Sequence, residues 1–258
     1  MGVINVTPDS FYDGGRHNST DRAVSLALSM LSEGADILDI GGESTRPGSE
    51  GVAAEIEIAR VVPVIEALSK LKPNAVISVD TSKADVAAES IAAGASIVND
   101  VSACSDPQMI PLLASTACGY IAMHMLGVPR TMQSNPDYKD VVKEVAEYLQ
   151  DRLDVLVSCG VAAERIALDP GIGFGKLLGH NIELIKAIPK FAALGRPVVI
   201  GASRKSMIGA LTGAAPDDRL AGSIAVAVAA SKLGAHVIRV HDVKATVDAL
   251  KVARAIWG

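Results

Sequence analysis

The chain has 258 residues, enough for one large domain or two small ones. Its 24 Lys and Arg residues against 29 Asp and Glu residues give a net charge of −5, which argues against a nucleic-acid-binding surface. Aromatic residues make up only 3%, too few for base-stacking platforms, and the longest uncharged apolar run, residues 220–231, is too short to cross a membrane. We therefore expect a globular protein with an aliphatic core and neither nucleic acid nor membrane as a partner.

Eight short apolar segments rich in β-branched residues recur along the chain and are predicted as strands. They are residues 3–6, 36–40, 75–80, 96–100, 120–124, 165–169, 197–201 and 236–240. Segments with a helical spacing of apolar residues lie between them, for example 21–34 and 138–158. Many helices are predicted to end at a left-handed glycine just before the next strand, at Gly34, Gly94, Gly119, Gly160, Gly195 and Gly234.

This alternation predicts an α/β fold, a (β/α)8 TIM barrel formed as a single domain by residues 1–258. An open doubly wound sheet is the alternative, but no GxGxxG motif follows the first strand. The cysteines Cys104, Cys118 and Cys159 are far apart, and the N-terminus shows no secretory signal. We therefore expect reduced thiols and a cytoplasmic location.

Polar side chains end all eight predicted strands, and in a barrel these ends meet at one rim. They are Asn5, Asp39, Asp80, Asn99 with Asp100, His124, Asp169, Ser203 to Lys205, and Arg239 with His241. Any one of them could merely cap the following helix, but capping does not easily explain all eight ends. The rim is therefore the predicted site.

Aromatic residues in two predicted loops suggest that this site binds a flat ligand. Residues 5–19 form a long loop that contains Phe11 and Tyr12, which favours a functional lid over a plain turn. Phe174 lies between glycines in the motif DPGIGFGK and could cover a planar ring. The buried polar groups Asp80, Asn99 and Asp169 need partners, and adjacent N–H donors of a heterocycle would supply them.

Basic residues near the last two strands suggest an anion on the other side of the rim, opposite those carboxylates. The motif SRKS, residues 203–206, opens a helix whose free N–H groups favour a phosphate. Arg239 and His241 are expected on one side of the last strand, although a salt bridge with an Asp is a simpler role for them. No HxH or HExxH spacing supports zinc, so we expect any metal to be Mg²⁺ on a diphosphate.

The motifs resemble those of the dihydropteroate synthases of the folate pathway. NVTPDSFYDGG, DIGGESTRPG, SVDTSK, VNDVS, MHMLGVPRTMQ, DPGIGFGK, SRKS and RVHD occur in that family's order over residues 2–242. The resemblance implies a transferase that joins 6-hydroxymethyl-7,8-dihydropterin diphosphate to p-aminobenzoate, releasing diphosphate and 7,8-dihydropteroate. DIGGESTRPG with SRKS is the specific part, because other pterin-binding barrels share pieces similar to the rest.

The resemblance also implies roles for individual residues. The pterin would be bound by Asp80, Asn99, Met123, Asp169, Lys205 and Arg239, and the diphosphate by Asn5, Arg239 and His241, with Asn5 as the Mg²⁺ ligand. The p-aminobenzoate would contact Thr45, Arg46, Pro47, Phe174, Lys205 and Ser206. Asp80, Asp169 and Lys205 would be catalytic, because preorganised charges can stabilise a cation-like transition state as diphosphate leaves. A sulfonamide would mimic p-aminobenzoate and inhibit the enzyme.

Two departures and two alternatives accompany this hypothesis. Leu126 stands where the family often has Gln, and the residues that usually precede the first strand are absent. A methyltetrahydrofolate-dependent corrinoid methyltransferase shares the barrel and pterin site, but SRKS and ESTRPG argue against it. A pterin-binding homologue without catalysis is the other alternative, and the intact Asn5, Arg239 and His241 argue against that. Residues 223–234 are apolar on more than one helical face, and together with the resemblance they favour a homodimer.

Overall fold

The computed structural model describes residues 1–7, 16–44, 48–49, 51–128, 130–132 and 136–257. Its strands confirm the eight predicted ones. They are β1 Gly2–Asn5, β2 Ile37–Gly41, β3 Val76–Asp80, β4 Ile97–Asp100, β5 Gly119–Met123, β6 Ile166–Asp169, β7 Val199–Ile200 and β8 Val237–Ile238. Their pairings within the sheets are parallel, as expected for strands separated by crossover helices.

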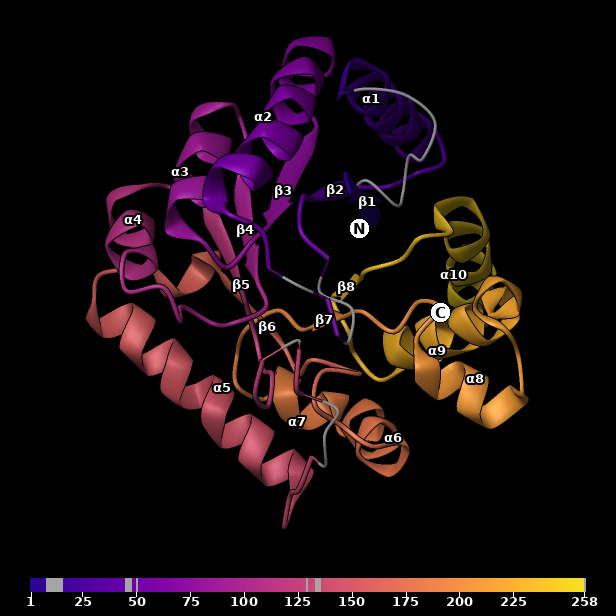
Figure 1. The fold of residues 1–258 in the computed structure, drawn as a ribbon. Helices are drawn as coiled ribbons and strands as arrows, with labels where there is room; N and C mark the ends of the chain where they lie inside the picture. The colour runs from indigo at the N-terminus through magenta and orange to yellow at the C-terminus, as the bar shows by residue number, and fades with distance from the viewer. Residues whose placement is uncertain (8–15, 45–47, 50, 129, 133–135, 258) are drawn as a thin grey trace.

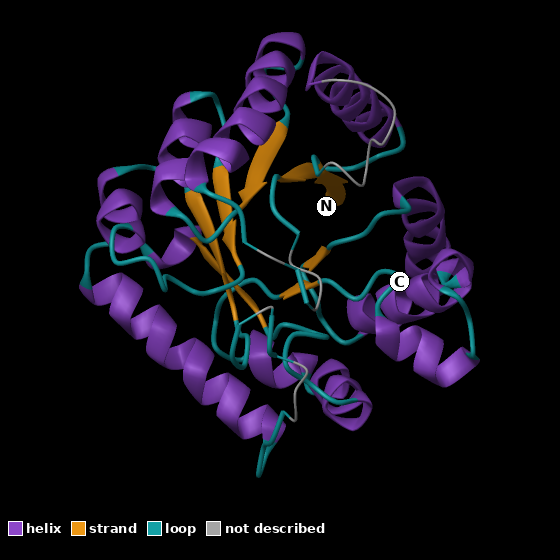
Figure 2. Cartoon of the chain, viewed as in Figure 1, coloured by secondary structure: helices purple, strands orange, loops and turns teal. Residues whose placement is uncertain are grey.

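The strands form the barrel predicted from the sequence. Six of them pair in the order β1 to β6, and β7 pairs with β8. Backbone hydrogen bonds join these two sheets at both edges: the amide of Leu168 donates to Pro197 O at 2.9 Å, and the amide of Val3 donates to Val240 O at 2.9 Å. Figure 2 shows the strands inside and the helices outside. The fold is therefore a TIM barrel, and its strands all end at one rim.

Helices connect the strands and surround them (Figure 1). They are α1 Arg16–Ser32, α2 Ala54–Leu71, α3 Ala84–Ala92, α4 Met109–Ser115, α5 Val141–Ser158, α6 Leu178–Lys186, α7 Ile188–Ala192, α8 Ser206–Thr212, α9 Leu220–Lys232 and α10 Val243–Trp257, with short 3-10 turns at Ala163–Arg165 and Pro216–Asp218. Sequence signals explain individual boundaries. The carboxylate of Asp140, for example, caps α5 by accepting a hydrogen bond from the amide of Lys143 at 3.0 Å.

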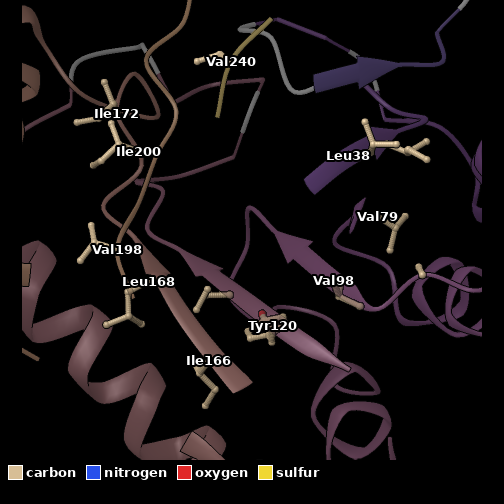
Figure 3. Packing of buried hydrophobic residues seen from close by; sticks show 14 of the residues in the cluster. Leu38, Val79, Val98, Tyr120, Ile166, Leu168, Ile172, Val198, Ile200 and Val240 are labelled. Carbon is tan, nitrogen blue, oxygen red and sulfur yellow. The ribbon is translucent and has the colours of Figure 1, made fainter. Parts of the chain in front are cut away.

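The core lies between the strands and the helices, and it is mostly aliphatic (Figure 3). Successive strand residues point to opposite faces, so each strand contributes to two environments. In β2, Leu38 and Ile40 are fully buried in the hydrophobic cluster, whereas Asp39 between them is bonded to Arg239 across the barrel. This alternation lets the barrel interior hold polar groups while the outer layer stays apolar.

The prediction that six glycines end helices is wrong for one of them, Gly119. Five of the six have positive φ, but Gly119 does not. It is the first residue of β5, and its amide donates to Ser96 O at 2.8 Å, because α4 has already ended at Ser115. Within the described residues, no helix combines the length and apolar character needed to cross a membrane.

Candidate active site

A buried ion-pair network occupies the interior of the barrel near its rim. The guanidinium of Arg239, which follows β8, donates from Nε to Asp39 Oδ2 and from Nη2 to Asp80 Oδ2, both at 2.6 Å. Asn99 at the end of β4 donates from Nδ2 to the same Asp39 oxygen at 3.1 Å. The structure thus brings predicted residues from the ends of several strands into contact. It also corrects the expectation of opposed acidic and basic sides, because Arg239 lies between the carboxylates.

Burial dominates the electrostatics of this network. Removal from water raises the pKa of Asp80 to about 7, although the charge of Arg239 lowers it, and the negative charge of Asp39 adds to the increase. Burial alone would lower the pKa of Arg239, but its two carboxylate partners raise it overall. Two carboxylates share one guanidinium here, so the interior carries an excess of negative charge whenever both are ionised. A ligand with N–H donors or positive character would compensate that charge.

Asp169 and Lys205 form the second part of the site. Asp169 ends β6, and its Oδ1 accepts a hydrogen bond from the amide of Gly171 at 2.7 Å. Burial raises the pKa of Asp169, and this amide partly offsets the increase. Burial lowers the pKa of Lys205 to about 7, partly opposed by the negative charge of Asp169. Both groups are therefore biased toward their neutral forms, which is typical of functional sites.

The position of Lys205 depends on the glycine-rich loop after β6. Its Nζ donates to the carbonyl of Ile172 and lies 4.1 Å from the centroid of the Phe174 ring. A Cβ on Gly173 would lie 2.9 Å from Lys205 Cδ, and the φ of Gly173 is +84°. Glycine is favoured at position 173 for two reasons. The backbone there is left-handed, and the side chain of Lys205 packs directly against the position that a Cβ would take. The lysine and the aromatic ring predicted for p-aminobenzoate are thus adjacent.

The loop after β7 is built around a left-handed Arg204 with φ of +58°. Its side chain bonds to Asp242 at 2.9 and 2.6 Å, so this arginine does not add to the basic cluster expected beside Lys205. Ser206 is exposed and begins α8, as predicted. His241 lies beside Ser203, with Nδ1 and Oγ 3.0 Å apart. The loops after β7 and β8 are therefore joined at the rim.

Other predicted residues lie at the rim or outside the described part of the chain. Asn5 is half-buried at the end of β1, and Met123 is buried at the end of β5. Thr45, Arg46, Pro47, Phe11 and Tyr12 lie outside the described residues.

The described ends of the loop that contains Thr45 to Pro47 are fixed to their surroundings. Arg60 on α2 donates to Gly42 O at 2.6 Å, and Ser49 Oγ donates to Ser44 O at 2.5 Å. Lys83, which precedes α3, bonds to Glu43 and to the buried Glu57.

The donor set near Asn5 fits a magnesium ion held mainly by a ligand. The described residues contain no group of three or more His, Cys, Asp and Glu side chains that could bind a metal. An amide oxygen such as that of Asn5 is a ligand that Mg²⁺ accepts, and Mg²⁺ commonly completes its shell with phosphate oxygens and water. The chemistry of Asn5 is therefore compatible with the Mg²⁺ expected from the sequence.

Sequence reasoning missed the functional context of Asp39, His124 and Lys176. Asp39 and His124 were identified as polar strand ends but received no role. The amine of Lys176 is buried against His124, with 2.9 Å between Nζ and Nδ1. Burial lowers the pKa of Lys176 to about 7 and that of His124 to about 3. The only sequence feature that points to Lys176 is its place in the motif DPGIGFGK, directly after a glycine-rich turn.

Comparison with known proteins agrees with this geometry. Residues 1–241 match the family described as pterin binding enzyme. A dihydropteroate synthase of Escherichia coli strain K12 is 49% identical over 255 residues, covering 99% of this chain and 90% of the relative. A Yersinia pestis dihydropteroate synthase structure with a sulfonamide drug complex has a TM-score of 0.94 at 45% identity, covering 99% and 93% of the two chains. A Xanthomonas albilineans dihydropteroate synthase with 4-aminobenzoic acid has a TM-score of 0.94 at 46% identity, covering 99% and 92%.

Proposed function

The chain belongs to the dihydropteroate synthases of the pterin-binding enzyme family, and from this premise we propose that Asp80, Asp169 and Lys205 catalyse the family's reaction in it. That reaction joins 6-hydroxymethyl-7,8-dihydropterin diphosphate to p-aminobenzoate, giving 7,8-dihydropteroate and diphosphate for folate biosynthesis. The observation that carries the assignment is a pair of carboxylates inside the barrel, the partly buried Asp80 bonded to Arg239 and the buried Asp169 near Lys205. We propose that residues 1–258 act as one domain in this reaction.

The pterin binds in the interior of the barrel. Asp80 and Asp169 accept hydrogen bonds from its N–H groups, Asn99 supplies a neutral amide, and Met123 lines the pocket. Arg239 lies over the ring and reaches the diphosphate together with His241. The burial of Asn99, Met123 and Asp169 and the partial burial of Asp80 support the assignment, because a carboxylate removed from water regains lost hydrogen bonds when it meets an N–H donor.

Diphosphate leaves when the bond between its oxygen and the pterin CH₂ group breaks and the electron pair goes to the oxygen. The positive charge that develops on the ring is stabilised by the ionised forms of Asp80 and Asp169, which act strongly in a site closed to water. Arg239 and His241 neutralise the leaving group. Asn5 would hold a Mg²⁺ ion, which would supply further neutralisation of negative charge when bound.

The aniline nitrogen of p-aminobenzoate attacks the pterin CH₂ carbon from the side of Phe174 and Lys205, and the proton that this nitrogen then loses passes to solvent. The resemblance implies that Thr45, Arg46 and Pro47 also contact p-aminobenzoate, and Ser206 at the start of α8 receives the carboxylate. The contact between Lys205 and the Phe174 ring supports this placement, because an aryl amine can lie against the same two groups. No covalent intermediate with the enzyme is needed.

One assay tests this proposal directly. Purified protein is mixed with Mg²⁺, 6-hydroxymethyl-7,8-dihydropterin diphosphate and p-aminobenzoate, and diphosphate release is measured. Release should require p-aminobenzoate and should be lost in Lys205→Ala, whereas the exposed Lys190→Ala on α7 should retain it. Diphosphate release in the absence of p-aminobenzoate would require a different nucleophile and would refute the proposal.

We also propose that the protein is a homodimer that associates through α8, α9 and α10. Of these helices, α9 packs against both α8 and α10 (Figure 1). Large apolar side chains are exposed on all three: Leu211, Leu220, Val252, Ile256 and Trp257. Exposed apolar clusters of this kind mark interaction surfaces. Light scattering after size exclusion should give twice the chain mass for the wild type and the single mass for Ile256→Asp. Val157→Asp, an exposed apolar position on α5, should remain dimeric.

The alternatives from the sequence receive less support. A corrinoid methyltransferase would not account for the dihydropteroate synthases among the relatives at 49% identity. A homologue without catalysis would not need the ionisable residues retained beside the pterin site. The free cysteines Cys104, Cys118 and Cys159 support the proposed cytoplasmic location.

A further inference from the structure

Lys176 is a buried lysine to which the proposed mechanism assigns no role. Its side chain lies between the loops that follow β5 and β6, and the residue is only 3% exposed. Nζ is 2.9 Å from the carbonyl oxygen of Phe174, 3.3 Å from that of His124 and 2.9 Å from His124 Nδ1. The two carbonyl oxygens accept hydrogen bonds from this amine, and His124 Nδ1 is its third polar neighbour.

The two loops touch through their backbones at this point. A Cβ on Gly171 would overlap the carbonyl oxygen of His124, and one on Gly175 would lie 2.6 Å from the carbonyl oxygen of Leu126. Both glycines also have positive φ, +70° and +64°. The contact leaves no room for a side chain at either glycine. Beside it, the amine of Lys176 donates to the carbonyl oxygens of His124 and Phe174, which need hydrogen-bond partners because they are removed from water.

Asn181 holds the same loop from the opposite side. It lies on α6 and is 4% exposed. Its Oδ1 accepts from the amide of Gly173 at 2.6 Å, and its Nδ2 donates to Leu177 O at 2.9 Å and to Lys176 O at 3.3 Å. The backbone on both sides of Phe174 is therefore fixed by two buried polar side chains from different elements.

We propose that Lys176 and Asn181 are positioning residues for the aryl amine substrate. By fixing the loop backbone they hold the Phe174 ring against Lys205, and this inference rests on the proposed function. The pterin side depends on them much less, because Met123 and Asp169 are partners in the β5–β6 ladder. The amide of His124 also donates to Asp169 O at 3.0 Å, which keeps these strand ends aligned without the lysine.

The test is steady-state kinetics with both substrates varied for Lys176→Met and Asn181→Ala. We expect the KM for p-aminobenzoate to rise about tenfold, the effect of losing one well-placed hydrogen bond. The KM for the dihydropterin diphosphate should stay within about twofold of wild type in Asn181→Ala, since the pterin pocket is held by strand pairing. Lys176→Met also removes a charge that lowers the pKa of Asp169, so its effect on that KM should be the larger of the two but smaller than its effect on the KM for p-aminobenzoate. Lys186→Met, an exposed lysine on α6, is the matched control and should leave both KM values unchanged.

Equal increases in both KM values, or a fall in kcat alone, would overturn the positioning role. Should Lys176→Met fail to fold, as a circular dichroism melt would reveal, Asn181→Ala carries the same test because it retains the buried amine. Failure of the proposed function is a separate outcome. In that case the wild type itself would release no diphosphate in the presence of both substrates.

Discussion

Replacing Asp39 by asparagine tests the idea that the two carboxylates compete for Arg239. The carboxylate of Asp39 is fully buried, accepts from Arg239 and Asn99, and adds its negative charge to the environment of Asp80. The carbonyl oxygen of the introduced amide can still accept from Arg239, so the arrangement survives while the charge is removed. We expect Asp39→Asn to lower the free energy of unfolding by about 1–3 kcal/mol, because its NH₂ group would be buried where Asp39 Oδ1 has no hydrogen-bond partner. Asp39→Ala, which removes the partner altogether, should cost about 3–5 kcal/mol.

The same substitution should change the pH dependence of catalysis. The pKa of Asp80 is raised to about 7, foremost by burial, and Asp39 contributes to the increase. Removing that charge leaves Asp80 as the only carboxylate paired with Arg239, so the pKa of Asp80 should fall. Since the ionised form binds the pterin, the acid limb of kcat/KM for dihydropterin diphosphate should move to lower pH by about one unit or more.

The assay is a pH series of kcat/KM together with a urea melt for the wild type, Asp39→Asn and Asp248→Asn. Asp248 is exposed on α10 and serves as the control for loss of one negative charge. A folded Asp39→Asn enzyme whose acid limb is unchanged or moves to higher pH would refute the reasoning, because Asp39 would then exert no electrostatic effect on Asp80.

Three further predictions follow from the same structure. Gly171→Ala should lower the melting temperature strongly, because its methyl group overlaps the carbonyl oxygen of His124 in a left-handed backbone, whereas Gly213→Ala, with φ of +74° and no atom within 4 Å, should cost only the backbone strain. The pKa of Lys176 is about 7 in the folded protein and 10.5 ordinarily, so between these values the unfolded chain binds more protons. Wild-type stability relative to Lys176→Met should therefore rise from pH 7 to pH 10 in urea melts, and a difference that falls would contradict this. A sulfonamide should inhibit turnover competitively with p-aminobenzoate, and turnover that is unchanged under excess drug would exclude the proposed aryl site.

The fold could be predicted from the sequence because buried parallel strands have a strong pattern. Segments such as 36–40 and 165–169 are apolar and β-branched, and each carries near its end the polar residue that lies at the rim. Gly119 was assigned wrongly because a glycine before a strand can either end a helix or begin the strand. Where α4 ends decides between these two, and the sequence around Ser115 contains no clear helix stop.

The sequence predicts which residues form the site better than it predicts which of them contact one another. Strand ends identify residues that reach the rim, but they do not say which ones meet across the barrel. Asp39 and Arg239 are 200 positions apart and pair only because both point inward from strands on either side of β1. The role of Lys176 depends on a backbone contact between Gly171 and His124, and no local pattern shows such a contact.

The shifted pKa values of Asp80, Asp169 and Lys205 link the stability of the barrel to the proposed reaction. Burial biases Asp80 and Asp169 toward their protonated forms and Lys205 toward its neutral form, so the site without ligand holds charges at a cost to folding. A pterin that gains positive character meets the carboxylates, and a departing diphosphate meets the basic groups. The interactions that form as diphosphate leaves thus compensate the charges that burial disfavours, and a barrel interior of low dielectric strengthens them. The burial that destabilises these charges in the free protein is for this reason the same property that makes them effective in the reaction.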